Sequence, residues 1–256
     1  MFNYAIIGGG RLARHFSHYF RLLEISCTCW TRDPYSPLNT FALSANDQRL
    51  RKTVADADCV LLLVSDDAIA TVLKQYPLLH EKQLIHCSGA LSFPGVAGVH
   101  PLMTFAENLY AIEVYESMPF MLEAGHSFNR LLPGLANPHF TIDVGDKARY
   151  HALCVMAGNY AQMLWKSVSD RFEQQLNLPA GTLHPYLAQL ADNFVQAPET
   201  ALTGPLSRND HQTIERNLLA LEADPLQHLY QAFVDFYHGS DWLDTMRVQT
   251  QMEQVL

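Results

Sequence analysis

A glycine-rich segment near the start of the chain constrains the fold more than any other feature. The apolar run Tyr4–Ile7 leads directly into Gly8, Gly9, Gly10, Arg11, Leu12 and Ala13. They match the pattern G-x-G-x-x-A, in which the first glycine makes a tight turn, the second lets a pyrophosphate approach the backbone, and the small third residue lets helix and strand pack closely. The helix that follows offers N–H groups and a positive dipole end to phosphate. This segment is predicted to bind a dinucleotide, and a tight turn with no ligand is the alternative interpretation. The predicted cofactor-binding residues are Gly8, Gly10, Arg11, Leu12 and Ala13.

The first half of the chain alternates short apolar runs with helical patterns. This alternation is typical of repeated βα units around a parallel sheet. Helices are expected to begin at about Arg11 and after Ser65. We expect strands at about Tyr4–Ile7, Ile25–Trp30, Cys59–Leu63, Gln83–Cys87, Val96–His100, Pro119–Leu122 and His139–Asp143. The sequence therefore predicts an α/β domain with a doubly wound, mostly parallel sheet over residues 1–143.

The pattern changes after Gly145, where helical periodicity replaces strand-like runs. Helices are expected at Ala148–Glu173, Leu183–Asn193, Asp210–Leu221 and Pro225–Tyr237. The first of these carries an apolar stripe at spacings of three and four, which is expected to face a core. The stripe consists of Leu153, Met156, Tyr160, Met163 and Leu164. A smaller all-α domain is predicted over residues 144–256.

Charge and composition exclude several classes of protein. With 17 basic and 26 acidic residues, the net charge of −9 argues against an electrostatic grip on nucleic acid or an anionic membrane. No run approaches the roughly 18 apolar residues of a membrane helix, so no membrane span is expected. The residues before Tyr4 contain no basic stretch or cleavage site, so no secretion signal is expected. Five cysteines at irregular spacing suit buried thiols in a reducing compartment, so a cytoplasmic protein is expected. Twelve histidines occur without an H-E-x-x-H spacing, so no metal site is expected.

The end of the second predicted strand indicates which dinucleotide is bound. An acidic residue at this position would hold a ribose 2′-hydroxyl, as in NAD-binding proteins. Here the strand ends with Thr31 and Arg32. The guanidinium of Arg32 can form a paired contact with a 2′-phosphate and Thr31 can donate a hydroxyl to it, which favours NADP(H). Asp33 lies one position later, and a shift of the loop that placed its carboxylate at the ribose would favour NAD instead.

Two further strand ends are expected near the cofactor, because ligands of such sheets bind at the carboxyl edge of the strands. The third strand ends at Val64 and Ser65, and the fourth at Ser88 and Gly89. Ser88 and Gly89 are candidates to approach the nicotinamide, and a simple turn is the alternative. Asp66 and Asp67 are interpreted as residues that complement the dipole of the following helix, in preference to catalytic acids.

The order of these motifs resembles a known family. The glycine pattern, Thr31-Arg32, the run from His86 to Ala90 and His100-Pro101-Leu102 are followed by Gly158-Asn159-Tyr160 and by the run from Thr203 to Asp210. Together they resemble two-domain NADP oxidoreductases with a Rossmann-like amino-terminal domain and a helical domain of unknown function, DUF2520. This family is related to ketopantoate, pyrroline-carboxylate and β-hydroxyacid reductases. One departure is Asn209, where such proteins often carry glycine, and asparagine also tolerates a left-handed turn.

The resemblance implies a role for Asn159. The helix asparagine of related reductases hydrogen-bonds the substrate oxygen, and the alternative is an amide bonded to neighbouring backbone. Lys166 follows two helical turns later and could donate a proton or bind a carboxylate, or it could simply be exposed to solvent.

Three other side chains are candidates for substrate chemistry. His100 closes the fifth strand at the ligand edge and could supply a proton, or it could shape the loop as a hydrogen-bonded histidine. Arg208 could bind a carboxylate through two hydrogen bonds, with an interdomain salt bridge or a helix cap as alternatives. Thr203, in the same loop, is a further substrate-binding candidate.

These observations favour an NADPH-dependent reductase of a small 2-oxo acid. One branch of the family that the chain resembles is similar to a non-standard ketopantoate reductase, and this resemblance implies ketopantoate as the substrate. The nicotinamide is expected in a cleft between the two domains. The alternatives are an imine or other carbonyl reductase and a non-catalytic NADP-binding sensor. Charged residues form only 17% of the chain, and related reductases dimerise through their helical domains, so a homodimer is expected.

Overall fold

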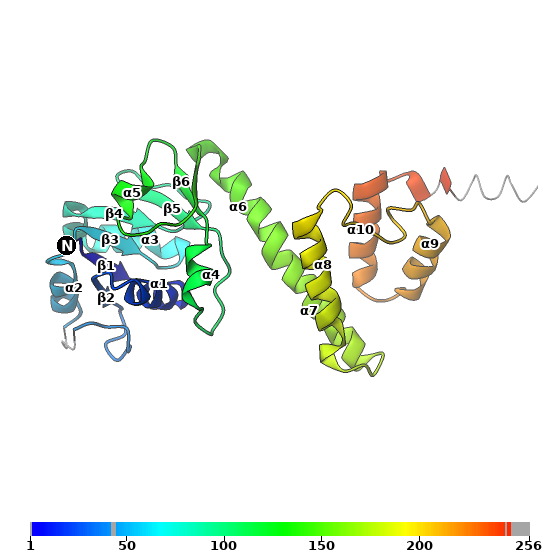
Figure 1. Cartoon of the computed structure of the whole chain (residues 1–256), viewed down its shortest axis with the longest axis horizontal. Coiled ribbons are helices and arrows are strands. Elements are labelled where there is room, and N and C mark those ends of the chain that lie inside the picture. Colours follow the sequence, from blue (N-terminus) through cyan, green and yellow to red (C-terminus); the bar gives the residue numbers. More distant parts are fainter. Residues whose placement is uncertain (1, 42–44, 244, 247–256) are drawn as a thin grey trace, which may run out of the picture. The chain divides into compact units, whose positions relative to one another are not determined.

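The computed structural model describes residues 2–41, 45–243 and 245–246 (Figure 1). Two compact units are present, Met1–Lys166 and Ser167–Leu256. They divide within a single helix, and the predicted domain boundary after Asp143 stays a prediction.

The first unit is built on the predicted sheet. Seven strands lie in the order β2-β1-β3-β4-β5-β6-β7, and all neighbouring pairs are parallel except β5 and β6. The α/β fold class is therefore confirmed, and each predicted strand is present. The strands are β1 (Tyr4–Ile7), β2 (Cys27–Trp30), β3 (Cys59–Leu62), β4 (Gln83–His86), β5 (Ala97–Pro101), β6 (Phe120–Glu123) and β7 (His139–Ile142).

The sheet is covered on both faces because side chains alternate along each strand. Tyr4 and Ile6 of β1 pack in one core with side chains of α1, whereas Ile7 packs in a second core with side chains of α2 and α3. A strand buried on both faces reads as a continuous apolar run, which is why the sequence revealed β1. The helices of this part are α1 (Arg11–Leu22), α2 (Asn46–Val54), α3 (Asp66–Gln75), α4 (Ile112–Glu116) and α5 (Phe128–Leu131), with short 3-10 turns at Pro77–Glu81 and Val144–Asp146.

One long helical segment leads out of the sheet unit. It consists of α6 (Lys147–Val155), a π-helical turn at Met156–Tyr160, and α7 (Ala161–Gln174). This confirms the helix predicted over Ala148–Glu173. The predicted burial of its apolar stripe is wrong for this structure, because Leu153, Met156, Tyr160 and Met163 are 56 to 65% exposed. None of these side chains belongs to the two cores of the sheet, since periodicity indicates an apolar face but not what covers it.

The second unit is helical. After a 3-10 turn at Ala180–Leu183 it contains α8 (His184–Gln196), α9 (His211–Ala220) and α10 (Leu226–His238). Its core is small and includes Ile214, Leu218 and Val234. Arg171 of α7 makes two hydrogen bonds of 2.6 Å with Asp224, and this contact holds the pKa of Asp224 down at about 2. Across the described residues, none of the helices combines the length and apolarity needed to cross a bilayer.

Candidate functional site

The first glycine of the turn is fixed between two strands. Its N–H donates to the carbonyl of Trp30 at 3.0 Å, and the preceding carbonyl, of Ile7, accepts from the N–H of Leu63 at 2.8 Å. Gly8 has a φ of +151°, and a Cβ at this position would overlap the carbonyl oxygen of Leu63. Gly8 is therefore required by the fold itself, whether or not a ligand is present.

The rest of the turn leaves an open approach to the start of α1. No heavy atom lies within 4 Å of the position that a Cβ of Gly10 would occupy. The first turn of α1 has no side-chain cap, so its first N–H groups have no side-chain acceptor among the described residues. Ala13 is buried, as expected for the small third residue, while Arg11 is exposed and Leu12 half-buried. An uncapped helix start beside open space is the kind of helix terminus at which anions bind in proteins.

The tip of β2 presents one exposed cation. Arg32 is exposed, whereas Thr31 is 5% exposed and its hydroxyl donates to the carbonyl of Asp33 at 2.8 Å. The carboxylate of Asp33 accepts from the N–H of Tyr35 at 2.9 Å, which ties it into its own turn. Of the two residues predicted to contact a 2′-phosphate, Arg32 is thus the one with an outward cationic group. The predicted contact of Thr31 stays a prediction.

The ends of β3 and β4 are joined by side chains. The hydroxyl of Ser88 donates to Asp66 at 2.7 Å and accepts from the N–H of Leu91 at 3.0 Å. Asp66 lies in the first turn of α3, as predicted, and Ser65 occupies the N-cap position. Val64 is half-buried and Ser65 exposed beside it. This network gives the loop after β4 a fixed shape at the carboxyl edge of the sheet.

Three aromatic side chains meet where β5 and α6 approach that loop. The Nδ1 atom of His100 lies 2.8 Å from the hydroxyl oxygen of Tyr150. A Cβ at Gly89 would lie 2.5 Å from Cδ2 of His151 and 3.2 Å from Nε2 of His100. The two imidazole rings are perpendicular, with centroids 5.9 Å apart. We call His100, Tyr150 and His151 the edge cluster.

Electrostatics keep two members of the edge cluster neutral. Burial, followed by the charges of His151 and Lys147, lowers the pKa of His100 to about 4. Burial and the neighbouring thiol of Cys154 raise the pKa of the Tyr150 phenol. Near neutral pH, His100 is therefore a neutral imidazole that takes part in hydrogen bonds, and not an imidazolium.

A buried ion pair anchors the start of α6 behind the edge cluster. Nζ of Lys147 lies 2.7 Å from Oε1 of Glu123, and the other carboxylate oxygen accepts from the N–H of Gly98 at 3.1 Å. His86 is fully buried, and its Nε2 lies 3.9 Å from the same carboxylate without a hydrogen bond among the described atoms. Burial, followed by the charge of Lys147, lowers the pKa of His86 to about 4, so this imidazole is neutral.

Sequence reasoning missed Tyr150, His151, Lys147 and Glu123. A signal was present in the helix, because Lys147, Tyr150, His151 and Cys154 follow the spacing of one helical face. Glu123 at the end of a strand gave no comparable signal, since its partner lies 24 residues away.

The other predicted substrate residues lie elsewhere in the chain. Asn159 is exposed in the π-helical turn, about 12 Å further along the helix axis than His151 at 1.5 Å per residue. Lys166 is exposed at the end of the first unit. Thr203 and Arg208 are exposed in the loop between α8 and α9. The roles of these residues stay predictions. Asn209 has a φ of +57°, which confirms the left-handed turn expected there.

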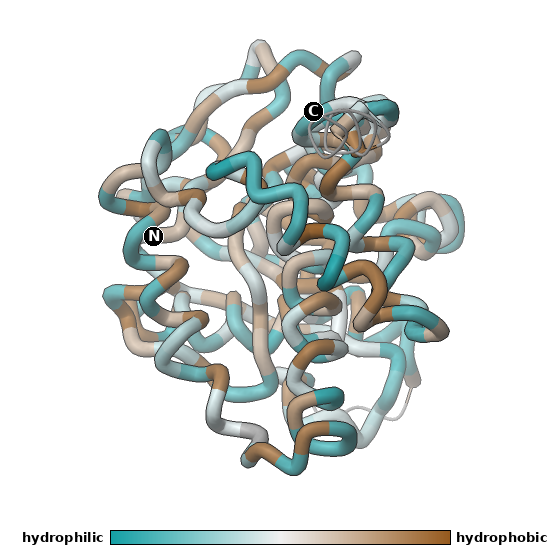
Figure 2. The backbone as a smooth tube through the Cα atoms, turned by 90° about the vertical axis from the view of Figure 1, so that its right-hand side faces the viewer, coloured by the Kyte–Doolittle hydropathy of each residue, from teal (hydrophilic) through white to brown (hydrophobic). Residues whose placement is uncertain are grey.

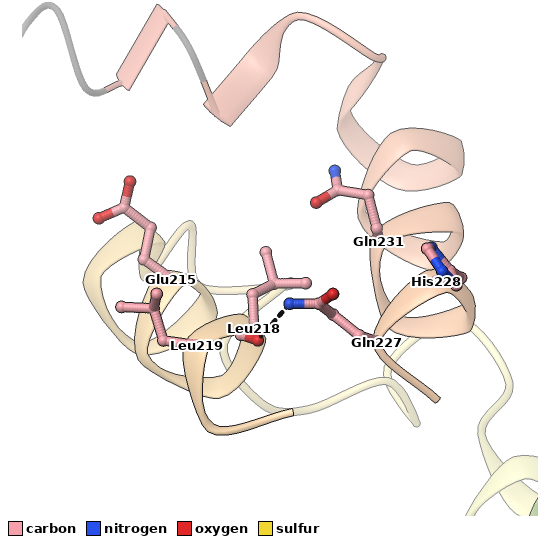
Figure 3. A pocket seen from close by; sticks show the side chains of 6 residues that line it. All are labelled: Glu215, Leu218, Leu219, Gln227, His228 and Gln231. Carbon is pink, nitrogen blue, oxygen red and sulfur yellow. Dashed lines mark hydrogen bonds between the residues drawn. The ribbon is translucent and has the colours of Figure 1, made fainter. Parts of the chain in front are cut away.

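The helical unit contains a pocket of about 470 Å³ between α9 and α10 (Figure 3). Its shape is held partly by the side chain of Gln227, which donates to the carbonyl of Leu218 at 2.8 Å. No residue predicted to bind substrate or cofactor lines it. The lining residues are Glu215, Leu218, Leu219, Gln227, His228 and Gln231. Within the described part of the chain, no group of three His, Cys, Asp or Glu side chains is placed to hold a metal ion.

Comparison with known proteins finds a match to one family model over less than half of the chain. Residues 118–235 match DUF2520, described as a domain of unknown function. No curated protein matches the sequence.

Solved structures share the fold over almost the whole chain. A Bacteroides fragilis protein described as a "putative NADP oxidoreductase" is 20% identical, with a TM-score of 0.72, and the match covers 93% of this chain and 98% of that one. A Thermotoga maritima protein is 24% identical, with a TM-score of 0.67 over 95% and 99% of the two chains. An imine reductase from Myxococcus stipitatus in complex with NADP+ is 17% identical, with a TM-score of 0.59 over 93% and 96%. The chain thus has a Rossmann-like α/β fold, and its residues 118–235, which include β6 and β7, are similar to the domain of unknown function DUF2520.

Proposed function

We propose that the chain is an NADP-dependent oxidoreductase that acts on a small carbonyl or imine substrate. The observation that carries this proposal is the open position at Gly10 before the uncapped start of α1, on the same sheet edge as the edge cluster. Proteins of the same fold include one described as an NADP oxidoreductase and an imine reductase bound to NADP+.

The strand order suggests how a dinucleotide would lie. β1 pairs with β2 on one side and with β3 on the other, so the order in which successive strands are added to the sheet reverses next to the glycine turn. Such switch points hold the pyrophosphate, with the two nucleoside halves on either side. The adenosine half would lie toward Arg32, and the nicotinamide half toward Ser65, Ser88 and Gly89. A bound NADPH would supply a hydride, while the protein supplies binding, orientation and protons.

The cofactor preference is the first test of this proposal. Fluorescence titration of the purified protein should show tighter binding of NADPH than of NADH. Arg32→Gln should weaken NADPH binding by about tenfold or more and leave NADH binding unchanged, because a charge-assisted contact to phosphate is worth about 1.5–3 kcal/mol. The matched control is Arg130→Gln, which removes an exposed guanidinium from α5. Equal binding of both nucleotides by wild type would contradict the preference, and binding of neither would remove the proposed function.

For the substrate, we propose a 2-oxo acid, with ketopantoate as the first compound to test. Asn159 would orient the carbonyl and Lys166 would contact the carboxylate, while Thr203 and Arg208 are kept as candidate substrate-binding residues of the loop between α8 and α9. An imine or another carbonyl would be served by the same cofactor site. Absorbance decay of NADPH with a panel of 2-oxo acids and cyclic imines separates these substrates. Binding without turnover of any of them would favour a sensor of NADP.

We also propose that the chain forms a homodimer in a cytoplasmic setting. Figure 2 shows apolar segments recurring along the helices, and the stripe on α6 and α7 exposes 56% of Leu153 and 65% of Met163. Apolar faces of this kind are buried in stable assemblies. A second copy is the proposed occupant, because only 17% of the residues are charged.

Light scattering at micromolar concentration should give twice the mass of the chain. The double variant Met156→Glu and Met163→Glu should give the monomer mass, because it places charges in the apolar stripe. The control is Gln162→Glu, which adds a charge at an exposed polar position of the same helix. A monomeric wild type would contradict the homodimer.

A further inference from the structure

Titratable side chains line one face of α6, and two of them lie at the carboxyl ends of β4 and β5. Tyr150 contacts His100 of β5, and His151 lies next to Gly89, just after β4. Lys147, Tyr150, His151 and Cys154 stand at the spacing of a single helical face. Lys147 is bound to Glu123, and Tyr150 to His100. We infer that His151 is the catalytic acid–base residue of the proposed reductase, and that His100 and Tyr150 are positioning residues. This inference rests on the proposed function.

The hydrogen bonds distinguish His151 from its neighbours. Lys147 is 3% exposed and ion-paired, and Nδ1 of His100 is bonded to Tyr150. His151 is half-buried, and its side chain makes no hydrogen bond within the part of the chain that the structure describes. Its ring nitrogens are therefore available to a substrate, whereas the low pKa of His100 makes that residue unsuited to carry a proton near neutral pH.

The contact with Gly89 locates His151 relative to the sheet. A Cβ at this glycine would lie 2.5 Å from Cδ2 of His151, so glycine is what allows the imidazole to approach the backbone just beyond β4. Ligands of parallel sheets bind outside this edge, and the nicotinamide half is expected beside Ser88 and Gly89. Of the three atoms nearest to a Cβ at Gly89, the one that belongs to α6 is Cδ2 of His151.

The proposed reduction needs one proton in addition to the hydride, and His151 would donate it. The substrate carbon receives a hydride and its electron pair from the cofactor, which is oxidised. The π electron pair of the C=O or C=N bond moves to the oxygen or nitrogen. His151, as imidazolium, gives its proton to that atom and becomes neutral imidazole, which solvent reprotonates. The ring of His100, which is hydrogen-bonded to Tyr150, lies perpendicular to the ring of His151 with centroids 5.9 Å apart, and in this proposal it positions that ring.

The test compares His151→Gln with His126→Gln, which replaces an exposed histidine in the turn after β6. We expect His151→Gln to lower kcat by about 100-fold or more, in line with general acid catalysis, with NADPH affinity within about twofold of wild type. Imidazole in the buffer should restore turnover to His151→Ala, because it can refill the space and carry the proton. Turnover of His151→Gln within about threefold of wild type, or a loss explained by weaker NADPH binding, would overturn the inference.

A second variant keeps the histidine and moves it. Gly89→Ala places a methyl group where the His151 ring lies, so we expect kcat to fall by about tenfold or more, without rescue by imidazole. Unchanged turnover in Gly89→Ala would show that the position of His151 does not matter.

A spectroscopic readout separates this inference from the proposed function. In protein labelled with ¹³C-histidine, the ring resonance that disappears in His151→Gln belongs to His151. NADP+ should shift this resonance and leave that of His126 unchanged. Absence of NADP+ binding would refute the proposed function, whereas binding that leaves the His151 resonance unmoved would refute the inference alone.

Discussion

Replacing Lys147 by methionine should lower the free energy of unfolding by about 3–5 kcal/mol, the largest loss of stability that we expect from a single side chain in this protein. Lys147 is 3% exposed and Glu123 is 5% exposed, and their charged atoms lie 2.7 Å apart. Without the ammonium group, the carboxylate remains buried and uncompensated. Urea unfolding followed by circular dichroism measures the change.

Two controls test whether the uncompensated carboxylate of Glu123 causes the loss of stability in Lys147→Met. The double variant Lys147→Met and Glu123→Gln should recover most of the lost stability, because a neutral amide can still accept from the N–H of Gly98. Arg14 and Glu107 form an ion pair whose side chains are 40% and 76% exposed, so Arg14→Gln should cost less than about 1 kcal/mol. A loss in Lys147→Met as small as that in Arg14→Gln would contradict the buried charge as the cause.

The ion pair of Lys147 and Glu123 also makes the free energy of unfolding depend on pH. Burial alone raises the pKa of Glu123, but the hydrogen bond and charge of Lys147, with contacts from Gly98 and Ser92, outweigh burial and leave the pKa below its ordinary value. A lowered carboxyl pKa stabilises the protein above the unfolded pKa, and this stabilisation is lost as pH falls through the folded pKa. The difference between wild type and Lys147→Met should therefore be large near neutrality and shrink below about pH 4.

His86 and His100 add a second pH effect of the same sign. Burial lowers the pKa of each from 6.5 to about 4. Between these values the unfolded chain binds protons that the folded protein does not, so stability falls as pH drops from 6.5 toward 4.

The sheet could be predicted because its signals are local. The central strand Tyr4–Ile7 is buried on both faces and reads as an apolar run, and the glycine pattern marks the turn that follows. The edge cluster could not be found in this way, because His100 and Tyr150 lie 50 residues apart and meet only when α6 packs on the end of β5. The apolar stripe of α6 and α7 was predicted to face a core. A period of 3.6 residues indicates an apolar helix face, but it does not show which part of the protein, or which other protein, covers that face.

The second large effect concerns two glycines of the turn, Gly8 and Gly10. Replacing each by alanine is expected to have a different consequence. Gly8→Ala should cost about 3 kcal/mol or more of folding free energy, because the new Cβ meets the carbonyl of Leu63 at a positive φ. Gly10→Ala should leave stability within about 0.5 kcal/mol of wild type, because its φ of −78° and ψ of −176° suit alanine and the space beside it is open.

Gly10→Ala, the variant with the smaller expected effect on stability, is expected to have a large effect on NADPH binding. The methyl group of Gly10→Ala occupies the position that a pyrophosphate needs, so NADPH affinity should fall by about tenfold or more while unfolding is unchanged. Gly145→Ala, at another glycine with open surroundings, should change neither quantity. Since Gly10 is dispensable to the fold, wild-type affinity in Gly10→Ala would mean that the turn is shaped by packing alone. Lost affinity with intact stability would mean that the open position at Gly10 is kept for a ligand.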